Sequence, residues 1–174
     1  SNLAYNTEIN DLLLTALSFS LTKVTGSSVN HIVLEGHGRE EIDETIDITK
    51  TVGWFTTMYP VRLEISEELI ISLKNTKENL RRIPNKGIGY GPLIGYKAKT
   101  LPRISFNYLG QFDKEYRTQG TYSFWNIIGE DSGKSIHCNN QDYNVINING
   151  MVIDGKLKFD IVTKLNEDRT NKLA

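Results

Sequence analysis

The apolar residues change their spacing along the chain, and this change limits the folds that the sequence allows. Residues 7–25 place apolar side chains at the period of an amphipathic helix, namely at Ile9, Leu12, Leu13, Ala16, Leu17 and Val24. Residues 29–35 and 52–65 are instead rich in β-branched and aromatic residues, which favour strands. A second helix is predicted over residues 66–82, capped by its first serine and stopped by Pro84. The chain therefore opens as helix, strand, strand, helix.

The second half of the chain is predicted to supply the rest of a sheet. Strand-like runs lie at residues 103–110, 122–128, 143–153 and 156–165. Asp154-Gly155, between the last two runs, is a typical two-residue hairpin turn. The glycine-rich residues 84–96 are predicted as a loop whose backbone approaches another surface closely. Together these elements predict an α/β (α+β) fold, a two-layer sandwich in which helices cover one face of a mixed sheet.

A few positions carry more specific expectations. Gly26 is placed to end the first helix in a left-handed conformation, and Asn6 or Thr7 to cap its start. Pro60 lacks an amide donor, so its strand is expected at an edge of the sheet or at a bulge. The aromatic residues expected in the two-layer core are Trp54, Phe55 and Tyr59.

Length and charge restrict the classes of protein that the chain can represent. Its 174 residues suit a single domain over residues 1–174, and the formal net charge is -1. This balance offers no basic surface for nucleic acid or for an anionic membrane. No apolar run reaches the roughly 20 residues that span a bilayer, and the first residues do not resemble a signal peptide. The single cysteine, Cys138, cannot form an intramolecular disulfide, which fits a reducing, cytoplasmic location.

The segment "EGHGRE", residues 35–40, is the first candidate site. Glu35 follows the apolar run "HIVL", and the two glycines let the backbone turn so that the carboxylate faces a bulky partner. The alternative for Glu35 is a structural ion pair with Arg39. His37 is interpreted as hydrogen-bonded in a tight turn, with a second titrating group as the alternative. Three roles stay open for Arg39: orienting Glu35, receiving a phosphate or carboxylate, or lying solvated at the surface.

Several motifs occur here in the order in which one known family has them. They are "NDLLLTAL", "EGHGRE", "TVGWFTTMYPV", "PNKGIGYG" and "FNYLGQFD", and "SIHCNNQDYNVININGMVIDGKL" is similar to the closing hairpin of that family. With these motifs, residues 6–165 resemble an epimerization domain of nonribosomal peptide synthetases. The resemblance implies a chloramphenicol acetyltransferase-like lobe of the condensation-domain superfamily, in bacterial biosynthesis of antibiotics and other secondary metabolites.

The sequence resembles only one of the two lobes that the family has. The family places its active site between the lobes, and its N-terminal lobe carries a motif of the form HHxxxDxxS. The three histidines, His31, His37 and His137, are not adjacent to one another, so that motif is absent. The chain therefore resembles the C-terminal lobe, and both of its ends are interpreted as cuts from a longer protein. The implied partners are the missing N-terminal lobe, a peptidyl carrier protein and the adjacent synthetase domains.

The resemblance implies inversion from L to D at the Cα of an aminoacyl or peptidyl thioester. The thioester would be carried on the phosphopantetheine of the carrier protein, and no cofactor is expected on the lobe itself. Proton removal from one face and return on the other requires two acid/base groups. Glu35 is the candidate for one group, and a histidine of the missing lobe for the other. In "FNYLGQF", Tyr108 is a candidate acid/base and Asn107 a donor to the enolate oxygen, and as strand neighbours they point to opposite faces.

Two other functions stay open. A condensation domain forms the peptide bond by acyl transfer in the same fold, although "EGHGRE" and "FNYLGQF" favour epimerization. The lobe is alternatively a structural or carrier-binding module, and the fragment alone is expected to be inactive. His31 and His37 have no cysteines or paired carboxylates at useful spacing, so no metal site is predicted. Residues 87–91 follow a helix rather than a strand, which excludes the usual phosphate-binding loop templates.

Overall fold

The structure, a computed structural model, describes residues 6–95, 100–112, 133, 137, 139–153 and 155–174. Its elements within these ranges are α2 (Ile9–Thr25), β1 (Val29–Gly36), β2 (Thr57–Glu64), α3 (Leu69–Arg81), the 3-10 helix η1 (Pro84–Gly87), α4 (Tyr90–Ile94), β3 (Ile104–Gln111), β4 (Ile146–Ile153), β5 (Lys156–Thr163) and α5 (Glu167–Leu173). The predicted strand at 122–128, Cys138 and Asp154 of the hairpin turn lie outside the described residues.

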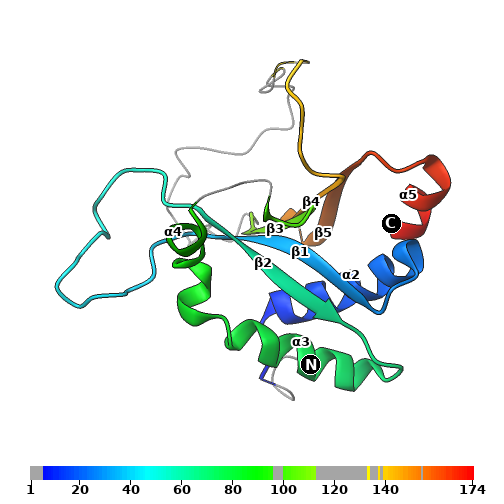
Figure 1. Cartoon of the computed structure of the whole chain (residues 1–174), viewed down its shortest axis with the longest axis horizontal. Coiled ribbons are helices and arrows are strands. Elements are labelled where there is room, and N and C mark those ends of the chain that lie inside the picture. The colour runs from blue at the N-terminus through cyan, green and yellow to red at the C-terminus, as the bar shows by residue number, and fades with distance from the viewer. Residues whose placement is uncertain (1–5, 96–99, 113–132, 134–136, 138, 154) are drawn as a thin grey trace, which may run out of the picture.

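The five strands form one mixed sheet in the order β2-β1-β3-β4-β5 (Figure 1). Strand β1 runs antiparallel to β2 and parallel to β3, and β4 runs parallel to β3 and antiparallel to β5. Figure 1 shows α2 and α3 on one side of this sheet, with α5 beside α2. The predicted fold class, a mixed sheet with helices on one face, is confirmed.

The hydrophobic core lies between these helices and one face of the sheet. Leu14 and Leu21 of α2 are fully buried there against side chains such as Ile32 of β1, Leu63 of β2 and Phe106 of β3. Alternate side chains of a strand point to opposite faces of a sheet. The residues between these core positions therefore form a second surface, which we call the far face. Its members include His31, Val33, Glu35, Met58, Pro60, Ser105, Asn107, Asn147, Asn149, Asp160 and Val162.

The first helix differs from the prediction in its buried face and in the residue at which it begins. Ala16 was expected inside and is exposed, whereas Leu14 is fully buried. The reason is that α2 packs against α3 and α5 as well as against the sheet. The helix begins later than the predicted caps, because the Asp11 carboxylate accepts the backbone N–H of Glu8 at 2.8 Å. The predicted end is confirmed, since Gly26 adopts a left-handed φ of 75°.

The strand predicted over residues 52–65 is shorter than expected and begins at Thr57. Residues 37–56 instead form a long connection, drawn in cyan in Figure 1, that projects away from the sheet. Trp54 lies in this connection and is 90% exposed, so its predicted place in the core is wrong, whereas Tyr59 is buried as expected. Pro60 lies on β2, an edge strand, as predicted.

The glycine-rich segment and the helix before it also differ from prediction. Helix α3 begins after Glu68 rather than at Ser66, because the backbone N–H of Ser66 is held by the buried Ser72 hydroxyl at 2.9 Å. The described part of this segment, residues 84–95, includes η1 and α4 in place of a simple loop. The predicted close approach is confirmed at Gly87, where an added Cβ would lie 2.2 Å from the ring of Tyr59.

Candidate active site

Glu35 and Asn107 come together on the far face of the sheet. The parallel pairing of β1 with β3 sets Leu34 beside Phe106, so the residues that follow are also lateral neighbours. Asn107 Nδ2 donates a hydrogen bond to Glu35 Oε2 over 3.2 Å. Glu35 is exposed and Asn107 is half-buried. The two residues therefore present a carboxylate, oriented at one oxygen by an amide donor, to a molecule that approaches this face.

Two glycines shape the turn that follows Glu35. At Gly36 an added Cβ would lie 2.9 Å from Thr57 Oγ1 and 3.3 Å from the carbonyl oxygen of Lys86. Gly38 has a φ of +66°, and a Cβ there would lie 1.6 Å from the carbonyl oxygen of Phe55. Side chains at these positions would collide with the neighbouring chain segments. This geometry agrees with the prediction that the glycines let the chain turn directly after the carboxylate.

His37 contributes to the turn itself. Its Nδ1 atom accepts the backbone N–H of Arg39 at 3.0 Å, which leaves Nε2 as the nitrogen that carries the proton of a neutral ring. The Nε2 atom lies 3.0 Å from Oε1 of Glu40. The structure therefore places His37 in a tight, hydrogen-bonded turn, which is the interpretation that the sequence favoured.

Arg39 holds the long connection between β1 and β2 together. Its guanidinium donates hydrogen bonds to the carbonyl oxygens of Ile48, at 2.8 Å, and of Thr51, at 2.9 Å. The same group lies 4.2 Å from the ring centroid of Phe55, in cation–π geometry. The described partner of Glu35 is Asn107, so the structure brings Arg39 to the connection and not to Glu35.

Tyr108, the third candidate, does not share a face with Glu35. It is half-buried and packs against the hydrophobic core, on the helical side of β3. The expectation that the two neighbours in "FNYLGQF" point to opposite faces is thus met, with Asn107 on the far face. Of the three residues predicted for catalysis, the structure brings two together.

Two further polar residues extend the Glu35–Asn107 pair into a line across the sheet. Strand register sets Asn149 of β4 beside Asn107, and Asp160 of β5 beside Asn149. Neighbouring strands lie about 4.8 Å apart, so these four residues, which we call the polar row, span roughly 14 Å. Sequence reasoning missed Asn149 and Asp160. The alternation in "ININGMVI" and "KLKFDIVT" indicates a face for each, but the order of the strands is needed to join them to Glu35.

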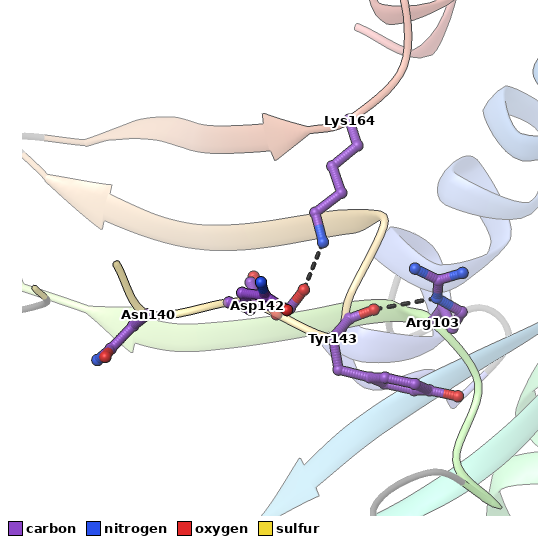
Figure 2. Close-up of a pocket in the computed structure, with 6 residues that line it drawn as sticks. Arg103, Asn140, Asp142, Tyr143 and Lys164 are labelled. Atoms are coloured by element: carbon purple, nitrogen blue, oxygen red, sulfur yellow. Dashed lines mark hydrogen bonds between the residues drawn. The ribbon is translucent and has the colours of Figure 1, made fainter. Parts of the chain in front are cut away.

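A second polar region lies where β3 and β4 begin and β5 ends. Figure 2 shows this hollow, of about 580 Å³, with Arg103, Asp142, Tyr143 and Lys164 around it. Arg103 Nε donates to the Tyr143 carbonyl oxygen at 3.0 Å, and Lys164 Nζ donates to the Asp142 carbonyl oxygen. The Asp142 carboxylate in turn accepts a hydrogen bond from Asn147 Nδ2. These contacts attach the 139–145 segment to β4 and to the residues next to β3 and β5, and they include none of the candidate catalytic residues.

The described part of the chain was searched for metal-binding clusters and for membrane-spanning helices. Within the ranges given above, no group of three or more histidine, cysteine, aspartate or glutamate side chains is arranged to hold a metal ion. A search of the same residues for a helix long and apolar enough to cross a membrane also found none.

Comparison with known proteins identifies the family. Residues 2–167 match the Condensation domain family. The chain belongs to the condensation-domain family. This condensation-domain lobe is 39% identical to the epimerization domain from the third module of tyrocidine synthetase B, with a TM-score of 0.81 over 99% of this chain and 40% of that one. The first condensation domain of the CDA synthetase shares the fold, with a TM-score of 0.61 at 13% identity.

The curated relatives are long peptide synthetases, of which this condensation-domain lobe spans a small part. Gramicidin S synthase 1 of Brevibacillus brevis is 47% identical over 90% of this chain and 16% of its own length. Bacitracin synthase 3 of Bacillus licheniformis is 46% identical over 99% of this chain and 3% of its own length. The chain is thus a lobe of a condensation- or epimerization-type domain of a nonribosomal peptide synthetase, as predicted.

Proposed function

We propose that this lobe is part of an epimerization domain, in which Glu35 exchanges a proton with the Cα of an aminoacyl or peptidyl thioester. The observation that carries the proposal is the placement of Glu35 itself. Its carboxylate is exposed on the far face, and Asn107 Nδ2 binds only one of its oxygens, at 3.2 Å. The other oxygen has no partner among the described residues, so it is available to a substrate.

The chemistry follows from the acidity of a carbon next to a thioester. When the carboxylate of Glu35 takes the Cα proton, the electron pair moves into the thioester carbonyl and gives an enolate. Return of a proton to the opposite face of Cα gives the inverted centre. Each positioned acid or base contributes about 10²–10⁴-fold to such a transfer. Asn107 keeps the Glu35 carboxylate in one orientation, and a histidine of the N-terminal lobe of the complete domain is our candidate for the second group.

The proposal also assigns partners to the lobe. The thioester is carried by the phosphopantetheine of a peptidyl carrier protein, so the cofactor enters with the substrate. The N-terminal lobe of the same domain covers the far face and closes the site over the polar row. The 39% identity to an epimerization domain, against 13% for a condensation domain of the same fold, supports this proposal over peptide-bond formation.

The substitution Glu35→Gln in the complete synthetase tests the proposal. Glutamine keeps the size of the side chain and removes the group that accepts the proton. We expect the exchange of the Cα hydrogen with solvent deuterium, measured by mass spectrometry on the loaded carrier protein, to fall by about 10²–10⁴-fold. The midpoint of urea unfolding should stay unchanged, because Glu35 is exposed.

Glu44→Gln is the matched control, because Glu44 is an exposed carboxylate of the connection between β1 and β2 and lies outside the polar row. Its exchange rate should equal that of the wild type. Near-normal exchange in Glu35→Gln would return Glu35 to a structural role. A wild-type synthetase that forms a new amide bond without Cα exchange would instead identify a condensation reaction.

A further inference from the structure

Glu40 is a carboxylate that the proposed chemistry does not use, and protein atoms nearly enclose it. Its side chain is 18% exposed, against 60% for His37 and 69% for Lys86. Oε1 lies 3.0 Å from His37 Nε2, and Oε2 lies 3.5 Å from Lys86 Nζ. No donor among the described residues meets hydrogen-bond geometry toward the buried Oε1. A carboxylate in this position depends on the positive charge of Lys86 beside it, because it has lost most of its water.

Lys86 lies on an unusual stretch of backbone. Asn85 and Lys86 have φ values of 43° and 47°, and Gly87 follows with a φ of 80°. Non-glycine residues rarely adopt this left-handed conformation, and it persists only where the surroundings hold it in place. The ring of Tyr59 packs against the turn at Gly87, and the Glu40 carboxylate attracts the Lys86 ammonium.

The same left-handed turn lies beside Gly36, the residue next to Glu35. The carbonyl oxygen of Lys86 lies 3.3 Å from the position that a Cβ of Gly36 would occupy, and Tyr59 Cε1 lies 3.6 Å from it. Burial and, to a smaller degree, the charge of Glu40 raise the pKa of Tyr59, so the ring and the carboxylate sit in one cluster. The Lys86 backbone, the Tyr59 ring and the last residue of β1 therefore lie in one neighbourhood.

We propose that Glu40 is a positioning residue, which holds the left-handed turn against Gly36 through its ion pair with Lys86 and thereby fixes the direction of Glu35. The reaction that would report this role rests on the function proposed above. Neutralising Glu40 leaves the Lys86 ammonium without its counter-charge, and the strained turn is then free to relax. Misplacement of a reacting group by about 1 Å costs up to about 10²-fold in rate.

The experiment uses the complete synthetase with a loaded carrier protein. We expect Glu40→Gln and Lys86→Met each to lower kcat for Cα exchange by about 10–10²-fold, with little change in KM. The double variant should be no slower than either single variant, because both changes break the same contact. The charge-reversed pair Glu40→Lys with Lys86→Glu should recover part of the rate. Glu44→Gln, an exposed glutamate of the same connection, is the control and should leave kcat unchanged.

Hydrogen–deuterium exchange of the peptide that covers residues 29–40 provides a readout that does not depend on the reaction. It should quicken in Glu40→Gln and not in Glu44→Gln, even if the synthetase turns out to form amide bonds. Wild-type kcat in Glu40→Gln, or losses that simply add in the double variant, would overturn the positioning role. Unchanged amide exchange over residues 29–40 would overturn it as well, while leaving the assignment of Glu35 as it stands.

Discussion

The turn at Gly38 allows a sharp test of how closely the backbone packs behind Glu35. Replacing Gly38 by alanine adds one methyl group at a left-handed residue, with a φ of +66°. That methyl group would lie 1.6 Å from the carbonyl oxygen of Phe55. Gly26 offers a matched control, because its φ is +75° and an added Cβ would meet nothing within 4 Å. The two substitutions share the backbone strain and differ only in the collision.

The expected losses follow from these contacts. Left-handed backbone costs a non-glycine residue about 1–2 kcal/mol, of which about 0.4–1 kcal/mol is offset by the stiffer unfolded chain. Gly26→Ala should therefore lower the free energy of unfolding by about 1 kcal/mol. Ordinary contact begins at 3.4 Å, so Phe55 must move by about 1.8 Å in Gly38→Ala. That movement removes the stacking of Arg39 on Phe55 and strains its loop hydrogen bonds, which adds about 2 kcal/mol.

Urea unfolding of both variants measures this difference, and limited proteolysis locates it. Surface connections such as residues 37–56 unfold locally while the core stays folded. Proteolytic cleavage within residues 41–51 should therefore quicken in Gly38→Ala and stay unchanged in Gly26→Ala. Equal losses of unfolding free energy in the two variants, with equal cleavage rates, would refute the reasoning. Such a result would mean that the Phe55 carbonyl group moves aside without lowering the free energy of unfolding.

Two further predictions concern stability. The pKa of Tyr59 is raised from 10.0 mainly by burial, so above about pH 10 the unfolded chain loses this proton first and the free energy of unfolding falls. Tyr59→Phe should remove that part of the alkaline decline in a series of urea titrations from pH 8 to pH 11, and an unaltered decline would count against the assignment. Leu14 is fully buried, and Leu14→Ala should cost about 2–5 kcal/mol in thermal unfolding. Leu93→Ala, at an 87% exposed position, should change the midpoint little, and similar shifts would contradict the described core.

Local signals in the sequence were enough for much of the fold. Gly26 at the end of α2 and Pro60 on an edge strand follow from the backbone chemistry of single residues. The inward side of α2 could not be predicted in this way, because Leu14 rather than Ala16 is buried only once α3, α5 and the sheet pack around the helix. The exposure of Trp54 could not be predicted either, because the hydrophobicity of a residue does not show that it lies in a connection that projects from the sheet.

The candidate site, too, could be predicted in part from local sequence signals. Strand alternation was sufficient to predict that Asn107 and Tyr108 point to opposite faces. Which of them meets Glu35 depends on where the helices lie, and that is a property of the assembled sheet. Asn149 and Asp160 required the neighbour order of β3, β4 and β5, which no local pattern contains.

The hydrogen bond between Glu35 and Asn107 joins residues 72 positions apart in the chain. Closing so long a segment is entropically unfavourable until many native contacts form together, whereas the β4–β5 hairpin closes locally. During refolding or synthesis, the hairpin is therefore expected to form early and the carboxylate–amide pair late. Recovery of activity would then lag behind recovery of β-structure. The delay between the two signals would measure how long β3 takes to pair with β1.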